Sequence, residues 1–433
     1  MTLDPDQQAA FDYTFPLYEM ARTRYLSVEL PANPNRGINK IGHRRLLTDH
    51  TMRGVTTPNN DTLYSGAWLD LSGGPVQIKI PKISQRYWSF HFMDAYSSTL
   101  SVLGSRNEGE GDLTVWVLHA QDTRPVPAGV RVVRMPTRDV WLIVRILVND
   151  QADAKTVHAL QDGISVQAVD AAVSLANPLG NPAAPGNLRG SPTDGANYLD
   201  VVNSMLARNP VPADAALLAP WRKWGMGDVL PGGKATAAMA TAWTEALPAL
   251  NNTLTGGFDA SGRVVQGWVY PNDAVGVYGA NHRLRANVAL GGLGALPSYE
   301  AVYLRANGDQ TGQPLQASQR YRVRFGKDDL GPVAFWSLSM YQVEQDGRLF
   351  FADNAIKRYI VSDRTQGLVK NADGSLDIIV QAAEPASAKD RANWLPAPAN
   401  SPTGEMRITL RAYLPSPALR EGKAPLPQIE KLN

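Results

Sequence analysis

Cysteine is absent from all 433 residues of the chain. Disulfide frameworks, thiolate nucleophiles, cysteine-based zinc fingers and iron–sulfur clusters are therefore excluded. No apolar run approaches the ~20 residues that a membrane-spanning helix needs, and residues 1–30 lack a basic segment followed by a continuous apolar one. As written, the sequence predicts a soluble cytoplasmic chain with no membrane partner. A periplasmic or secreted location is expected only if the N-terminus has been trimmed.

An excess of one charge is also missing, because 42 Lys and Arg residues face 40 Asp and Glu residues and leave a net charge of +2. Binding to a nucleic-acid backbone normally leaves a basic footprint, so nucleic acid is not an expected partner. The 6 histidines are scattered singly, which predicts no metal site. The signatures G-x-S-x-G, H-E-x-x-H and GxxxxGK[ST] are absent, and no cofactor is expected.

Core-forming residues, by contrast, are plentiful. Hydrophobic residues make up 44% of the chain, which includes 10 Trp, 15 Tyr and 9 Phe. This composition is typical of a globular protein. Single cores stop growing near roughly 250 to 300 residues, so the length predicts two or three domains.

Hydrophobic spacing indicates mainly β structure with a helical insert. Apolar residues recur at helical intervals over 5–27, which predicts an amphipathic helix that kinks or breaks near Pro16. Short β-branched and aromatic runs between 50 and 150 alternate with period two and predict an antiparallel sandwich or barrel. After an alanine-rich helical stretch, the same alternation resumes and predicts a second sandwich of jelly-roll type. The predicted divisions are an N-terminal helix at 1–30, a β-sandwich at 31–150, a helical module at 151–260 and a jelly roll at 261–433.

The segment "PNNDTLY" places Asn59, Asn60, Asp61 and Tyr64 against an apolar strand. A proline followed by asparagines and an aspartate is typical of a turn, in which the Asp61 carboxylate accepts backbone N–H groups. Alternatively, these amide, acid and phenol groups point into a cleft and orient a polar substrate. Both interpretations are open at this point.

Two further segments of the first half carry candidate site residues. His91 is either a strand histidine hydrogen-bonded at a sheet surface or an acid or base with Asp94 nearby. Arg138 and Trp141 lie beside a strongly apolar strand. An arginine there is either a buried ion-pair partner, for example of Asp61 or Asp94, or a clamp for a ligand.

Charged and aromatic groups also recur around one predicted helix of the second half. Tyr278, Asn281 and Arg285 are spaced to share a helix face, and an ion pair from Arg285 to Glu300 would lock that helix to the next strand. In the first half, Arg106 lies in a glycine-rich acidic loop, where it is either part of a flexible hairpin or a bidentate partner for a carboxylate or phosphate.

Trp336, Tyr341 and Trp394 lie in apolar segments of the second β region. Aromatic residues at this density normally form sandwich core, but exposed indole and phenol faces also stack on sugars. Buried rings would indicate sandwich core, and solvent-exposed rings would indicate a sugar-binding surface.

Segments in both halves resemble one bacterial family, in which a domain of unknown function 1254 precedes a domain of unknown function 1214. The first half matches in "GHRRLL", "PNNDTLYSGAWLDLS", "GSRNEGEG" and "VPAGVRVVRMPTRDVWLIVRILVND", and the second in "YGANHRLRANVALGGLGAL", "PVAFWSLSMYQ" and "NWLPAPANS". The resemblance implies an immunoglobulin-like β-sandwich, a helical insert and a C-terminal jelly roll, often in homo-oligomers. It implies no reaction and no catalytic residues. Leu296 stands where a typical member has asparagine, so a role of that asparagine does not transfer.

Three functions follow from these features. The first is a cofactor-independent hydrolase or lyase for a small or oligomeric polar substrate, with its site in a cleft between the two β domains. Asp61 would then act as acid or base, Tyr64 and His91 as proton-transfer partners, and Arg138 or Arg106 as the anion-stabilising group. The second is a non-catalytic protein that binds a glycan or another small molecule. The third is a structural oligomer with a large apolar surface patch.

Overall fold

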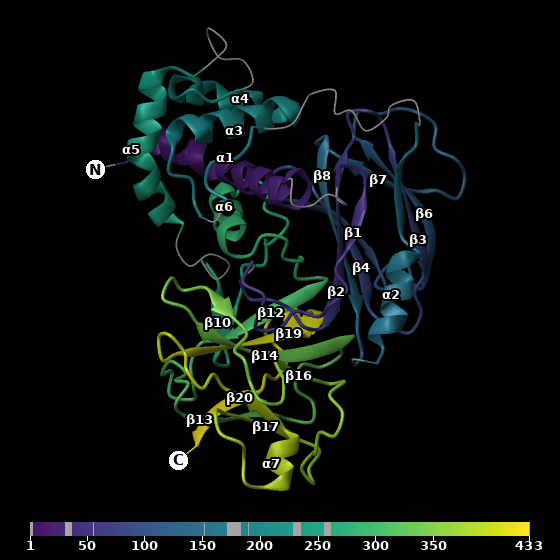
Figure 1. The fold of residues 1–433 in the computed structure, drawn as a ribbon, viewed down its shortest axis with the longest axis vertical. Coiled ribbons are helices and arrows are strands. Elements are labelled where there is room, and N and C mark those ends of the chain that lie inside the picture. Colours follow the sequence, from purple (N-terminus) through teal and green to yellow (C-terminus); the bar gives the residue numbers. More distant parts are fainter. Residues whose placement is uncertain are drawn as a thin grey trace.

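The computed structural model describes residues 3–30, 37–54, 56–150, 152–170, 183–188, 190–227, 235–254 and 261–432. Most of the regular structure is β sheet, and most helices gather in one layer beside the sheets (Figure 1). The prediction of a mainly β fold with helices is therefore confirmed. None of the helices in these ranges is both long and apolar enough to cross a membrane.

The N-terminal β part contains two sheets that share one core. The five-stranded sheet has the order β1 (Ile41–His43), β2 (Thr62–Asp70), β8 (Asp139–Leu147), β4 (Trp88–Met93) and β5 (Thr99–Gly104). The four-stranded sheet has the order β7 (Arg131–Met135), β6 (Gly111–His119), β3 (Val76–Lys82) and β9 (Ser165–Ala168). Each strand predicted between 50 and 150 is present, although β6 and β7 pair in parallel. Helix α2 (Ala154–Asp162) adds Val157 to the shared core.

The helical layer combines segments that are far apart in the sequence. Helices α1 (Pro5–Arg24), α3 (Gly195–Arg208), α5 (Ala237–Thr253) and α6 (His282–Gly291) contribute to one apolar cluster. The short helices η2 (Pro212–Asp214), α4 (Ala215–Leu218) and η3 (Ala219–Trp224) join α3 to the segment before α5. A Cβ at Gly195 would lie 2.2 Å from the carbonyl oxygen of Ala240, so only glycine permits this approach of α3 to α5.

The predicted first helix is present, but it is not amphipathic and has no break at Pro16. Helix α1 is buried on nearly all sides rather than on one face, and even Thr14 and Glu19 are inaccessible to solvent. It also runs through Pro16 without a break and continues as a π-helical turn, η1 (Tyr25–Glu29). The physical reason is its position, because α3 and α6 both pack against it.

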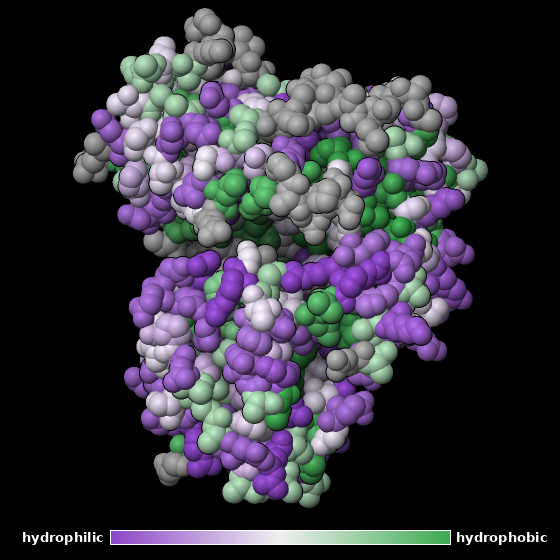
Figure 2. Space-filling model, in the orientation of Figure 1, coloured by the Kyte–Doolittle hydropathy of each residue, from purple (hydrophilic) through white to green (hydrophobic). Residues whose placement is uncertain are grey.

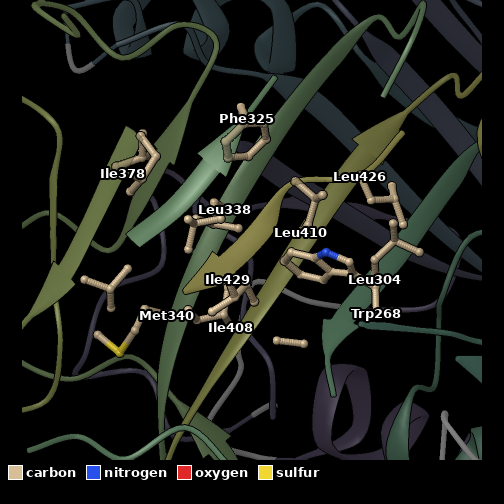
Figure 3. Close-up of a cluster of buried hydrophobic side chains, with 14 of the residues drawn as sticks. Trp268, Leu304, Phe325, Leu338, Met340, Ile378, Ile408, Leu410, Leu426 and Ile429 are labelled. Atoms are coloured by element: carbon tan, nitrogen blue, oxygen red, sulfur yellow. The ribbon is translucent and has the colours of Figure 1, made fainter. Parts of the chain in front are cut away.

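The C-terminal β part again has two sheets around one core (Figure 3). The larger sheet has the order β10 (Arg263–Val265), β11 (Trp268–Tyr270), β12 (Ala301–Ala306), β19 (Met406–Tyr413), β14 (Phe335–Val343) and β15 (Leu349–Phe350), and β16 (Ile360–Ser362) also pairs with β14. The smaller sheet has the order β18 (Trp394–Pro396), β17 (Leu376–Gln381), β13 (Arg320–Phe325) and β20 (Gln428–Leu432). Helices α7 (Ala388–Ala392) and α8 (Pro417–Arg420) lie in connections. Side chains such as Trp268, Leu304 and Leu338 fill the space between the sheets.

The helical layer and the two β parts meet near the middle of the molecule (Figure 1). On the face shown in Figure 2, the surface is hollowed between the helices above and the C-terminal strands below, and hydrophilic side chains line the lower edge of the hollow. Tyr87 and Val102 of the N-terminal part pack against Leu296, Phe335 and Tyr413 of the C-terminal part. The polar residues described next surround this contact.

Candidate functional site

A row of polar residues crosses the outer face of the five-stranded sheet. Tyr64 on β2 is directly opposite Arg145 on β8, and Arg145 is directly opposite Ser89 on β4. Alternate residues of these strands, such as Leu63 and Val144, point the other way into the core. The row therefore lies on the outer face, where Val102 and Leu147 pack against Phe335 and Tyr413 of the C-terminal β part.

A matching row crosses the facing surface of the C-terminal sheet. Tyr303 on β12 is directly opposite Arg411 on β19, and Arg411 is directly opposite Ser337 on β14. Both rows thus have the order tyrosine, arginine, serine across three neighbouring strands. In each row the tyrosine is half-buried and the other two residues are buried.

Arg145 is 5% exposed and has no carboxylate within ion-pair distance among the described residues. Its guanidinium donates to the Gly294 carbonyl oxygen at 2.7 Å and lies 5.4 Å from the centre of the Tyr64 ring. Burial acts to lower the pKa of Arg145, but the neighbouring phenols outweigh it and raise that pKa above its ordinary value. These phenols belong to Tyr64, Tyr303, Tyr413 and Tyr87.

Arg411 is a second buried guanidinium without a carboxylate partner among the described residues. It donates to Ser339 Oγ at 2.7 Å and to the Thr57 carbonyl oxygen at 2.9 Å. Burial acts to lower the pKa of Arg411 as well, but Tyr341, Tyr413 and the more distant Asp61 carboxylate outweigh burial and raise that pKa. Other arginines of similar burial, Arg24 and Arg208, do have acidic partners.

Asp61 does not occupy a solvent-facing position. Its side chain is fully buried, Oδ1 accepts from Arg364 Nη2 at 2.7 Å, and Oδ2 accepts from Ser337 Oγ at 2.5 Å. The proposed Asx turn is also not its main role, because these partners come from the C-terminal part. A carboxylate engaged at both oxygens and sealed from water is poorly suited to act as a general base. The geometry favours a structural ion pair between the two β parts.

We expect the Asp61→Asn substitution to lower the free energy of unfolding by about 3 kcal/mol, because it removes the buried carboxylate partner of Arg364 and leaves that guanidinium only its pair with the more exposed Asp363. Chemical denaturation measures this loss. Asp363→Asn is the matched control, since Asp363 pairs with the same arginine at 2.8 Å but is 33% exposed. We expect that change to cost less than about 1 kcal/mol. A loss of function in Asp61→Asn at unchanged stability would contradict the structural role.

Glu300 pairs with Arg106 rather than with Arg285, so the predicted Arg285 to Glu300 pair is wrong. Arg106 Nε donates to Glu300 Oε2 at 2.7 Å, and Tyr87 donates to Glu300 Oε1 at 3.0 Å. Burial raises the pKa of Glu300, and Arg106 offsets this only in part. Arg106 is therefore engaged by a protein carboxylate and belongs to the contact between the two β parts.

His91 lies beside Arg145 on the outer face of the sheet. Its Nδ1 is 3.5 Å from Arg145 Nη1, and its Nε2 is 2.8 Å from Thr99 Oγ1. Burial, and then the charge of Arg145, lower the pKa of His91 well below its ordinary value. The ring is therefore neutral, and because arginine can only donate, Nε2 carries the proton and donates to Thr99.

Tyr278 and Arg285 lie apart from both rows, beside the helical layer. Helix α6 begins at His282, so Tyr278 precedes it and Asn281 caps it, and the predicted shared helix face is wrong. The Arg285 guanidinium lies 5.3 Å from the ring centre of Tyr13 and donates to His282 Nδ1 at 2.8 Å. In the same region, burial raises the pKa of Asp94 to about 6.

Arg138 joins neither Asp61 nor Asp94. It donates to the carbonyl oxygen of Arg208 at 3.3 Å, at the end of α3, because it lies in the turn that precedes β8. The predicted ion pair is therefore wrong. Trp141 stacks on Trp68 with ring centres 5.5 Å apart.

The remaining predicted residues have structural partners. Asn59 donates to the Tyr413 hydroxyl at 2.8 Å, and Asn60 donates to the Thr48 carbonyl oxygen. Tyr341 is fully buried and donates to the Pro58 carbonyl oxygen at 2.7 Å, so its ring is not available for a sugar. Trp336 is half-buried and stacks on Phe325, and Trp394 is buried.

Arg145 and Arg411, which have no carboxylate partner among the described residues, escaped prediction from the sequence, as did Tyr303 and Tyr413. Both arginines lie within mostly apolar strand segments, "VWLIVRILV" and "MRITLRAYL". A charged residue in the middle of a strand that is buried on both faces is the signal that would have identified them.

Fold and site together define a class of protein with two β parts whose facing sheets enclose buried arginines and tyrosines. The model of one family of proteins of unknown function (DUF1254) matches residues 38–168, and that of a second (DUF1214) matches residues 300–417. Together these models span more than half of the chain. The chain belongs to the two-domain family of unknown function that they define, and the resemblance seen in the sequence is confirmed.

One solved structure supports the fold. The crystal structure of the VPA0106 protein from Vibrio parahaemolyticus is similar over 99% of this chain and 99% of that chain, with a TM-score of 0.69 and 23% identity. A putative uncharacterized protein from Burkholderia cenocepacia aligns over 100% of this chain and 90% of its own, with a TM-score of 0.48 and 14% identity. No curated protein matches the sequence.

Proposed function

We propose that the protein binds a small organic anion at the contact between the two β parts, with Arg145 as the anion-binding group. The observation that carries this proposal is a buried guanidinium without a carboxylate, surrounded by tyrosines. An unpaired buried charge costs several kcal/mol, and a carboxylate ligand would offset that cost. Arginine suits this role because its planar fork can donate two parallel hydrogen bonds to one carboxylate.

Space and solvent access on the tyrosine side support the proposal. Gly66 lies on the same face as Tyr64, and a Cβ there would meet only the Leu142 carbonyl oxygen, at 3.6 Å. Tyr64, Gly66 and Tyr303 are half-buried, whereas Arg145 is buried. A ligand could thus enter beside the phenols and reach the guanidinium beneath them. The phenols would add hydrogen bonds and apolar contact to the carbon skeleton of the ligand.

Titration calorimetry with acetate and propionate tests this proposal. We expect saturable binding of one propionate per chain, which is lost when Arg145 is replaced. Heats no different from dilution for both acids, at concentrations up to tens of millimolar, would refute an anion site at Arg145.

A hydrolase or lyase is the second candidate function. The observation that favours it is Tyr64, a half-buried proton donor or acceptor whose ring centre lies 5.4 Å from the guanidinium of Arg145. Such a phenol can transfer a proton to a substrate held by the arginine. In this proposal Tyr64 replaces Asp61 as the acid–base group.

With a substrate found by screening, we expect Tyr64→Phe to reduce kcat about 100-fold, within the range of general acid–base effects, while KM changes little. Phenylalanine keeps the aromatic ring beside the guanidinium of Arg145 and removes only the hydroxyl group. The control is Tyr25→Phe, at a tyrosine in η1 away from the rows. An unchanged kcat in Tyr64→Phe would exclude this tyrosine as the proton-transfer group.

We also propose that the N-terminal pair of sheets is an immunoglobulin-like sandwich and the C-terminal pair a jelly roll. The shared core of each pair supports this architecture. Assembly into homo-oligomers and binding of glycans stay predictions.

A further inference from the structure

The two polar rows, each with an arginine between a tyrosine and a serine, lie at the contact between the β parts. The charged groups around this contact carry more positive than negative charge. Four guanidiniums surround the contact, from Arg106, Arg145, Arg364 and Arg411. Glu300 pairs with the first of them, and both Asp61 and Asp363 pair with the third. Arg145 and Arg411 have no carboxylate within ion-pair distance among the described residues, and His91 is neutral. Three carboxylates thus stand beside four guanidiniums, and the two buried ones, Arg145 and Arg411, have no carboxylate of their own among the described residues.

Tyr303 and Tyr413 connect these two charges. Tyr303 is the cross-strand neighbour of Arg411, and Tyr413 follows Arg411 by two residues on the same face of β19. Burial raises the pKa of Tyr303, while both Arg145 and Arg411 act to lower it. Both guanidiniums therefore lie close enough to Tyr303 to influence its hydroxyl group. The two arginines come from different β parts, so the positive field forms only where these parts meet.

Like charges buried near each other repel, and the carbonyl and hydroxyl acceptors of Arg145 and Arg411 carry no negative charge to cancel that repulsion. Glu300 and Asp61 act on these guanidiniums only from beyond ion-pair distance. One anionic group could neutralise only one of the two guanidiniums. A ligand with two carboxylates could neutralise both. It would also gain from the second contact without a second loss of translational freedom.

From this juxtaposition we infer that the natural ligand carries two carboxylate groups, one held by Arg145 and the other by Arg411. This inference rests on the proposed anion site and specifies its ligand class. The Tyr64 and Tyr303 rings would flank the carbon chain between the carboxylates, since each lies beside one of the arginines.

Titration calorimetry of the full chain with two series of acids tests the inference. The monocarboxylates are acetate and propionate, and the dicarboxylates are malonate, succinate, glutarate and adipate, which vary the distance between the charges. We expect at least one dicarboxylate to bind more than tenfold tighter than propionate. A dicarboxylate has two equivalent ends, so it would bind about twofold tighter than a monocarboxylate even if only one carboxylate were held. A tenfold gain therefore requires a second contact.

Substitution of Arg411 provides a second test of the inference. We expect Arg411→Gln to weaken the best dicarboxylate at least tenfold more than it weakens propionate, so that the two affinities become similar. Arg145→Gln should weaken both series. Because Arg411 also holds the Thr57 carbonyl oxygen, a thermal melt checks that the variant is folded. If it is not, the comparison of the two series on the unmodified chain decides alone.

The outcomes separate this inference from the function on which it rests. If monocarboxylates bind and no dicarboxylate binds more tightly, the two-carboxylate inference is overturned while the anion site stands. If neither series binds, both are overturned. If a folded Arg411→Gln variant weakens propionate as much as the dicarboxylate, Arg411 serves the same carboxylate as Arg145 and the inference fails.

Discussion

Replacing Arg208 by methionine is expected to lower the free energy of unfolding by about 4 kcal/mol, which is near the middle of the range for a broken buried ion pair. Arg208, at the end of α3, donates to Asp139 through Nε at 2.9 Å and through Nη2 at 2.6 Å. The same Nη2 lies 3.3 Å from a carboxylate oxygen of Asp70, the cross-strand neighbour of Asp139. Methionine would leave two adjacent carboxylates in a site with almost no exposure.

The pH dependence of this loss follows from Asp139. Burial acts to raise its pKa, but hydrogen bonds from Arg208 and Asn209 and the charges of Arg24 and Arg208 outweigh burial and hold the pKa below its ordinary value. A carboxyl group with a lowered pKa in the folded state stabilises the protein above its unfolded pKa of about 4. This contribution disappears as the pH falls through the folded pKa. The difference between the parent and the variant should therefore be full near pH 7 and narrow below about pH 4.

Denaturant unfolding at several pH values measures both effects. Arg324→Met is the matched control, because the pair of Arg324 with Asp377 has a similar distance of 2.8 Å but the arginine is 47% exposed. We expect the control to lose less than about 1 kcal/mol. Equal losses in the two variants would mean that the buried ion pair does not hold α3 to the N-terminal sheet.

Much of the fold follows from local signals in the sequence. Alternation in "VWLIVRILV" and "RYWSFHFM" predicts β8 and β4 because every second side chain enters the core. Helix α1 could not be read in the same way, because neighbours that pack on every side remove the periodic contrast on which the prediction depends. The number of neighbours of a helix is a tertiary property, and it leaves no simple period in the sequence.

The candidate site was predictable only in part for a related reason. Turn chemistry correctly drew attention to Asn59, Asp61 and Tyr64, and the structure places all three at the contact between the β parts. Their partners, such as Arg364 and Ser337, are roughly 300 residues away in the chain, and no local pattern links them. The ion pairs predicted for Arg138 and Arg285 are wrong, because closeness in the sequence does not determine contacts between different strands and helices.

Replacing Arg145 by glutamine is expected to weaken the binding of propionate about 100-fold, which corresponds to about 2.8 kcal/mol and fits the loss of one or two charge-assisted hydrogen bonds. Glutamine keeps a donor but loses the charge and the planar fork, so it should bind far less tightly than the parent. Arg145→Lys restores the charge alone and should recover only part of the affinity. Titration calorimetry measures all three proteins.

Arg358→Gln provides the control for this series. Arg358 also donates to backbone carbonyl oxygens, those of Ala392 and Trp394, but it lies beside α7 and β18 rather than in either row. We expect this variant to bind propionate as the parent does. If glutamine at position 145 left the affinity within twofold of the parent, the buried guanidinium would serve only to bind Gly294, and the anion would have to be sought beside another unpaired charge such as Arg285.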